Sequence, residues 1–166
     1  MYMRFKALLL GLFLVGEIAA CDLVNPNEVD YRAQALAETK RREDLWKALN
    51  IHDYDFKFQR ACACSDKATQ PVTIHVRNDA IARILDSTGA VVSPSQDIPW
   101  PTVDSLYSWT RRFLNNKNFA VQVEFDTTFQ FPQTITGEDP GRSLTKHVST
   151  NFVQQPPGTP AMRLPD

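Results

Sequence analysis

The clearest alternating pattern in the 166-residue chain is Asp53-Tyr-Asp-Phe-Lys-Phe-Gln-Arg-Ala-Cys-Ala-Cys64. The aromatic residues of this stretch share one parity with Arg60, Cys62 and Cys64, while Asp, Lys, Gln and Ala occupy the other. A period of two with aromatic residues on one side is typical of a strand with one buried face. We therefore expect the central strand of an antiparallel sheet here, with both cysteines at its far end on the aromatic face.

The regions before and after this strand predict an α+β fold, an antiparallel β-sheet with helices packed on one face. Helices are expected over residues 28–49 and, capped by Thr102, over residues 103–114. Further strands are expected at residues 71–77, 80–86, 119–126, 133–136 and 144–152, with Asn78-Asp79 as a tight turn. The order of helix and then strands occurs twice, which is the pattern of a pseudo-repeat but also arises by chance.

Three finer expectations concern faces and ends. In the first helix, the charged run Glu38–Asp44 predicts a solvated face, while Leu45, Trp46 and Leu49 pack on the sheet. In the last strand, alternation places Val148, Thr150 and Phe152 on one side. Residues 154–166 contain four prolines and predict a disordered tail, so a single domain is expected over residues 28–153.

The first residues have the pattern of a bacterial export signal that ends in a lipidation site. Arg4 and Lys6 precede an apolar run over residues 7–16, which is shorter than the roughly 20 residues of a membrane-spanning helix. Ile18-Ala-Ala-Cys21 then resembles a lipobox, although Glu17 just before it is an unusual charge. We expect a signal peptide at residues 1–20, an acylated Cys21, a tether at residues 21–27 and a location in the cell envelope, facing the periplasm or exterior.

Composition and motifs narrow the function. The chain is 43% hydrophobic and 22% charged, with a net charge of −1 and no basic stripe, so nucleic acid is not an expected partner. Six glycines form no phosphate-binding loop, and no Ser, His and acid pattern indicates a nucleophile. We expect a non-enzymatic binding or scaffolding domain without a cofactor. Its expected partners are the membrane, through the lipid, and an envelope protein.

Several stretches together resemble a bacterial family known only as domain of unknown function 6174. They are Leu45-Trp46, Tyr54-Asp-Phe56, Cys62-Ala-Cys64, the hairpin around Asn78-Asp79, the helix start at Thr102–Leu106, and Val123-Glu-Phe-Asp126 leading to Phe131-Pro132. The resemblance spans roughly residues 43–152 and implies a small exported protein, often a lipoprotein. This chain differs from the family pattern at Ala63 and Gln130. The resemblance implies no activity.

The pair Cys62 and Cys64 leaves several readings open. An oxidising compartment and a lipidated Cys21 favour a disulfide, which needs a bend at Ala63 because Cα atoms two apart in a strand lie about 6.6 Å from each other. A copper or zinc site would need further ligands, and His75 has the opposite parity to the buried face of its strand. A thiol-redox pair and two free thiols are the other readings.

Overall fold

The structure is a computed structural model that describes residues 26–93, 98–138 and 144–160, with side chains from residue 31 onward. The expected signal peptide, the lipidation of Cys21 and most of the tether lie outside these ranges and stay predictions. The expected turn that begins at Glu138 also lies largely outside them, and Glu138 itself ends a strand.

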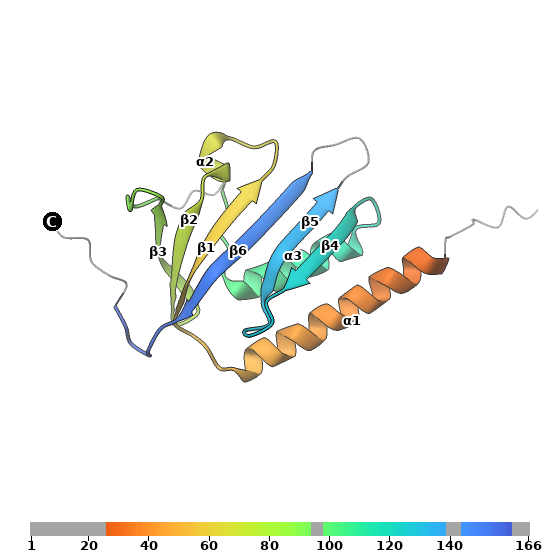
Figure 1. Ribbon diagram of the computed structural model, residues 1–166, viewed down its shortest axis with the longest axis horizontal. Coiled ribbons are helices and arrows are strands. Elements are labelled where there is room, and N and C mark those ends of the chain that lie inside the picture. The colour runs from red at the N-terminus through yellow and green to blue at the C-terminus, as the bar shows by residue number, and fades with distance from the viewer. Residues whose placement is uncertain (1–25, 94–97, 139–143, 161–166) are drawn as a thin grey trace, which may run out of the picture.

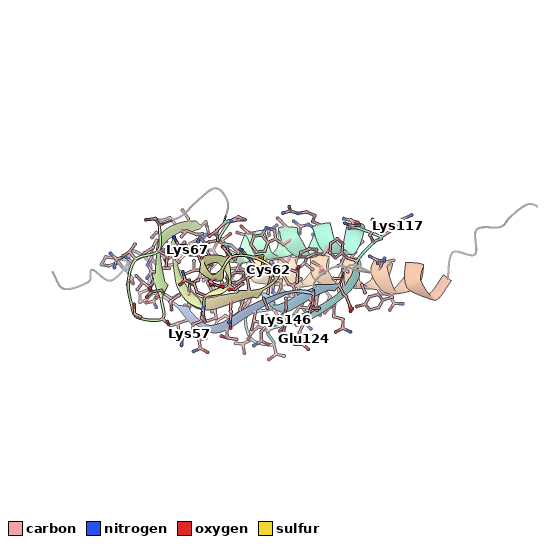
Figure 2. The ribbon with its side chains drawn as sticks, turned by 90° about the horizontal axis from the view of Figure 1, so that it is seen from above. Lys57, Cys62, Lys67, Lys117, Glu124 and Lys146 are labelled. Atoms are coloured by element: carbon pink, nitrogen blue, oxygen red, sulfur yellow. A yellow bond between two sulfur atoms is a disulfide. The ribbon has the colours of Figure 1, made fainter. Side chains whose placement is uncertain are left out.

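Six antiparallel strands form one sheet in the order β3-β2-β1-β6-β5-β4 (Figure 1). Their bounds are β1 Tyr54–Ala61, β2 Val72–Arg77, β3 Ala80–Asp86, β4 Ala120–Phe125, β5 Pro132–Glu138 and β6 Thr145–Gln154. The helices are α1 Pro26–Ala48, the single turn α2 Asp66–Thr69, and α3 Val103–Asn115. Seen from above, α1 and α3 lie on the same side of the sheet, which confirms the α+β arrangement (Figure 2).

Strand β1 is central because its aromatic face supplies the core. Tyr54, Phe56 and Phe58 are at most 1% exposed and face α3. Burying each of these rings stabilises the fold by about 1.5–3 kcal/mol. The Tyr54 hydroxyl accepts a hydrogen bond of 3.0 Å from the backbone N–H of Val103, so the first turn of α3 is fixed directly to β1.

Local signals for the turn and the helix cap are confirmed. Asn78 and Asp79 have φ angles of 49° and 63°, as a two-residue hairpin turn with the twist of its strands requires. Thr102 accepts a hydrogen bond of 3.2 Å from the backbone N–H of Ser105 and caps α3. These two sites fix where the β2–β3 hairpin and α3 begin.

The element order repeats a helix followed by three strands, with α2 inserted in the first half. The strand order also repeats, because each half places its third, second and first strands in turn, as β3-β2-β1 and then β6-β5-β4. Corresponding strands of the two halves run in opposite directions, since β1 and β6 pair antiparallel where the halves meet. The pseudo-repeat therefore holds for the order of elements and strands but not for strand direction.

The buried stripe of α1 differs from the expectation. Thr39, Glu43 and Trp46 are buried at helical spacing, while Leu45 and Leu49 are more than 40% exposed. Glu43 is buried within the charged run because it forms ion pairs with Arg111 of α3 and with Lys47. The prediction of a wholly solvated charged face was therefore wrong at Glu43. The ion pair of Glu43 with Arg111 joins α1 to α3, whereas the sequence predicted packing through Leu45 and Leu49.

The prediction for the faces of β6 was also wrong. His147 and Ser149 face the core, and Val148 and Thr150 do not. Opposite Phe56 of β1, the register shifts so that two residues of β6 face one, and Asn151 adopts a φ of 52°. This β-bulge reverses the parity and returns Phe152 to the core, where it packs on Tyr54 at 5.1 Å between ring centroids.

At the start of β1, a cluster of charged and polar side chains on the open face of the sheet is joined around Asp55. Asp55 accepts from Arg77 at 2.7 Å and from Gln155 at 3.0 Å, and lies 2.9 Å from His75. Arg77 also donates to the backbone carbonyls of Tyr54, Val76 and Thr159. We call Asp55, His75 and Arg77 the Asp55 cluster.

The segment after β6 has defined contacts in the part that the structure describes. Asp53 Oδ2 accepts from the backbone N–H of Gly158 at 3.1 Å, and its backbone oxygen accepts from Gln155 at 2.9 Å. Asp53 also accepts from Asn78, and these backbone N–H groups, Asn78 first, lower its pKa. Residues 154–160 thus differ from the disordered tail expected over 154–166, of which 161–166 lie outside the described ranges.

Candidate functional site

Cys62 and Cys64 follow directly after the end of β1. The chain bends at Ala63, the two Cα atoms lie 5.2 Å apart, and the sulfurs form a disulfide in the structure. Cys62 is half-buried and Cys64 is exposed, so the pair lies at the rim of the aromatic face and not within it. The bend shortens the separation from the extended-strand value, as the sequence argument required.

Arg60, two residues before Cys62, lies on the aromatic face of β1. The residue is 8% exposed and is therefore buried. The guanidinium lies 5.6 to 5.8 Å from the ring centroids of Phe58, Trp100 and Trp109. One nitrogen donates to the carbonyl of Pro99 at 2.7 Å. Arg60 is thus held by three aromatic rings and one backbone oxygen.

The charge of Arg60 has no carboxylate partner among the described residues. A guanidinium carries five N–H donors, and the Pro99 carbonyl accounts for one of them in this part of the chain. Burial lowers the pKa of Arg60 from its usual range, because desolvation disfavours the charged form. The group is nevertheless charged at neutral pH, since arginine does not lose its proton in proteins.

A hollow of about 370 Å³ opens beside this guanidinium, and we call it the Arg60 pocket. Residues from β1, α3, β6 and the loop before α3 line it. They are Arg60, Pro99, Trp109, Arg112, Phe113 and His147. The walls are aromatic, and the charged side chains among them are both arginines.

His147 of β6 forms part of the pocket wall. Its ring packs edge-on against Trp109 at 5.0 Å and against Phe58 and Phe113 at about 6 Å between centroids. Burial, and secondarily the charge of Arg60, lower the pKa of His147 to about 4. The imidazole is therefore neutral at pH 7. Its buried Nδ1 has no hydrogen-bond partner among the described residues.

Two histidines that could have completed a metal site with the cysteines, His75 and His52, lie elsewhere in the fold. His75 belongs to the Asp55 cluster on the open face of the sheet, as its parity predicted, and His52 contacts Asp79 at the β2–β3 turn. Within the described ranges, no three His, Cys, Asp or Glu side chains gather in a way that would hold a metal ion. Nor does any described helix have the length and apolar character to cross a membrane.

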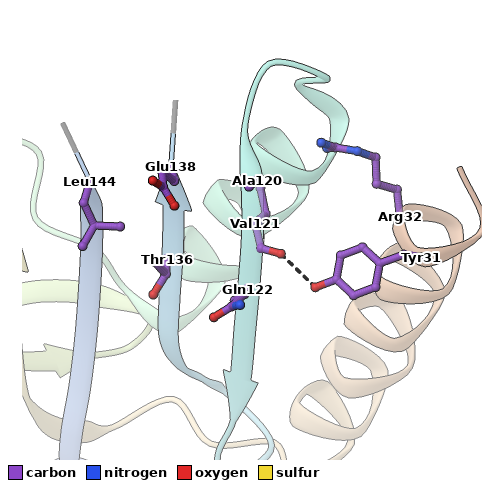
Figure 3. A pocket seen from close by; sticks show the side chains of 8 residues that line it. All are labelled: Tyr31, Arg32, Ala120, Val121, Gln122, Thr136, Glu138 and Leu144. Atoms are coloured by element: carbon purple, nitrogen blue, oxygen red, sulfur yellow. Dashed lines mark hydrogen bonds between the residues drawn. The ribbon is translucent and has the colours of Figure 1, made fainter. Parts of the chain in front are cut away.

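A larger hollow of about 600 Å³ lies between the start of α1 and the edge strand β4 (Figure 3). Tyr31 donates to the backbone carbonyl of Val121 at 2.8 Å. Arg32 donates to carbonyls at the end of α3, including Leu114 at 3.0 Å, and to Phe119. The guanidinium of Arg32 therefore links α1 to the end of α3 and the start of β4. We interpret this hollow as a packing contact between these elements.

A family model described as a family of unknown function, DUF6174, matches residues 38–138. The chain belongs to this family. Neither the search of curated proteins nor the search of solved structures found a match.

The DUF6174 match extends from α1 to the end of β5 and includes Arg60, both cysteines and the α3 wall of the pocket. It ends before β6, which supplies His147. The parity of β1 placed Arg60 on the aromatic face from sequence alone. Sequence reasoning missed the pocket itself, because its walls come from elements up to 87 residues apart, a pairing that no local pattern contains.

Proposed function

We propose that this protein is a lipid-anchored module of the bacterial cell envelope that binds a ligand or partner without catalysis. The lipobox-like Ile18-Ala-Ala-Cys21 supports the anchor. The Arg60 pocket supports binding, and it is the observation that carries the proposal.

Arg60 carries a buried charge without a carboxylate partner among the described residues, and this burial has an energetic cost. Removing an ion from water costs several kcal/mol even after relaxation, and a partner must offset this cost. Arg60 obtains part of the offset from three aromatic rings, at about 0.5–2 kcal/mol for each favourable contact. A concave aromatic pocket with a few convergent polar groups is the usual form of a binding site. The N–H groups of Arg60 that do not bond to Pro99 are suited to pair with an acceptor group of a ligand or partner.

The anchor is tested on the full-length protein expressed in its bacterial host. Intact mass should show a chain that begins at Cys21 and carries acyl chains, and the protein should fractionate with membranes. Cys21→Ser should release it from the membrane fraction. An unprocessed chain in the cell interior would contradict the proposal.

Binding is tested by placing a photo-crosslinking residue at Asn115, an exposed position one turn beyond Arg112 on α3, in the native envelope. The matched control is the same residue at Lys57, which is exposed on the opposite face of the sheet. Adducts are expected at position 115 and not at position 57, and mass spectrometry identifies what is attached. Equal labelling at both positions would argue against a dedicated site.

Exposure of the disulfide favours a second candidate, a thiol-redox role for Cys62 and Cys64. Cys64 is exposed, so a reductant can reach the bond. Intact mass with and without reductant would show whether the pair is bridged in the envelope. A pair that cycles between the two states during growth would favour this alternative. Stoichiometric copper or zinc in the purified protein would instead favour a metal role.

A further inference from the structure

We propose that the Arg60 pocket binds a small organic carboxylate attached to a planar apolar group. This inference rests on the proposed binding function and names the chemical class of the ligand. It follows from two features of the pocket, its two arginine side chains and its aromatic walls.

Two guanidinium groups serve the anionic end. Arg60 is buried with free donor capacity, and Arg112 is an exposed residue of the last turn of α3 on the rim. The neighbouring Arg111 is instead paired with Glu43, while no ion pair of Arg112 occurs in the described part of the chain. Arginine pairs with carboxylates through two parallel N–H bonds, so its planar fork favours a planar anion.

His147 adds a neutral polar group at the same place. Because the imidazole is uncharged at pH 7, one of its ring nitrogens carries a proton and the other accepts. Its unpartnered Nδ1 is buried beside the guanidinium of Arg60. The neutral ring adds no charge beside the two arginines. The donors that a bound carboxylate would pair are therefore those of Arg60 that the Pro99 carbonyl does not use.

The apolar part of the lining is formed by Trp109, Phe113 and Pro99. Aromatic side chains prefer offset-stacked or edge-on contacts with another ring, worth about 0.5–1.5 kcal/mol beyond burial. A volume of about 370 Å³ is at the lower end of the range for small-molecule sites. The site thus fits a compact ligand of about one ring with its carboxylate.

The experiment uses the full-length lipidated protein in detergent micelles and follows tryptophan fluorescence, since Trp109 lines the pocket. Benzoate is the probe, benzamide is its neutral counterpart, and acetate carries the charge without the ring. Saturable binding is expected for benzoate, with benzamide and acetate each at least about tenfold weaker, because each lacks one of the two recognised parts. Equal affinity for benzoate and benzamide would overturn the assignment of an anion.

Variants locate the site. Arg112→Ala should weaken benzoate about tenfold or more, because it removes a charge-assisted hydrogen bond at an exposed position that folding does not need. Lys57→Ala removes the same charge from the opposite face and should leave the affinity unchanged. Arg60→Met should abolish binding while far-UV circular dichroism stays native. An Arg112→Ala protein that binds benzoate normally would overturn the site.

The outcomes separate this inference from the proposed function. Site-specific crosslinks at position 115 without any benzoate binding would keep the binding module and overturn the carboxylate ligand. Benzoate binding without membrane anchoring would keep the ligand class and overturn the anchored envelope module.

Discussion

A largely buried arginine lies near each end of β1. Arg77 of β2 lies beside its start, Arg60 lies near its end, and the two have different partners. Arg77, whose side chain is 11% exposed, has a carboxylate and three carbonyls as partners. Arg60, 8% exposed, has one carbonyl and three aromatic rings. A cation that is paired with a carboxylate inside the protein stabilises the fold. One with incomplete partners next to a hollow is available to a ligand.

The largest effect is expected from removing Arg77 from the Asp55 cluster. Arg77→Met should lower the free energy of unfolding by about 3 kcal/mol, because it leaves Asp55 and several carbonyls without their donor. Urea unfolding followed by circular dichroism measures it. A change of a few tenths of a kcal/mol would show that the Asp55 cluster is held in place without its arginine.

The pH dependence of stability tests the end of β1 at the Arg60 pocket, through His147. The pKa of His147 is about 4 in the folded chain and about 6.5 in the unfolded chain, so the unfolded chain binds a proton first as pH falls. Stability from this group is complete above pH 6.5 and decreases by roughly 3 kcal/mol as pH falls through 4.

Urea unfolding at several pH values measures this dependence. His147→Phe should remove this part of the loss, and His52→Gln, at an exposed histidine, should retain it. Identical pH profiles for the wild-type protein and His147→Phe would show that His147 is not the group concerned.

The disulfide is expected to matter less for stability. Its closed loop is very short, so Cys62→Ser with Cys64→Ser should cost about 1.5 kcal/mol. Thermal unfolding with and without reductant measures the same quantity on the unaltered protein. Unfolding at growth temperature after reduction would instead assign the bend at Ala63 a central role in folding.

The smallest expected effect has the opposite sign and completes the comparison. Arg60→Met keeps the volume and removes an incompletely paired charge, so the free energy of unfolding should rise by about 1 kcal/mol. The same substitution thus destabilises at position 77 and stabilises at position 60. A large loss of stability at position 60 would mean that the aromatic rings already complete its environment.

The success of the sequence predictions depended on how local each signal was. The face of Arg60, the turn at Asn78-Asp79 and the cap at Thr102 follow from neighbours in the sequence, and the structure has them as expected. Glu43 was misplaced because its partner Arg111 is 68 residues away. The faces of β6 were misplaced because the bulge depends on pairing with β1, which alternation within one strand does not contain.

The bulge at Asn151 also limits how the length of β6 can change. On one side of it, odd-numbered residues point to the helices, and on the other Phe152 does so from an even position. Deleting Asn151 would restore a regular ladder with Phe152 opposite Phe56, so this ring would still face Trp46, Phe129 and Phe131. Deleting a residue between His147 and the bulge would instead turn His147 to the open face of the sheet. Related chains should therefore separate the positions equivalent to 147 and 152 by five residues where the bulge is present and by four where it is absent.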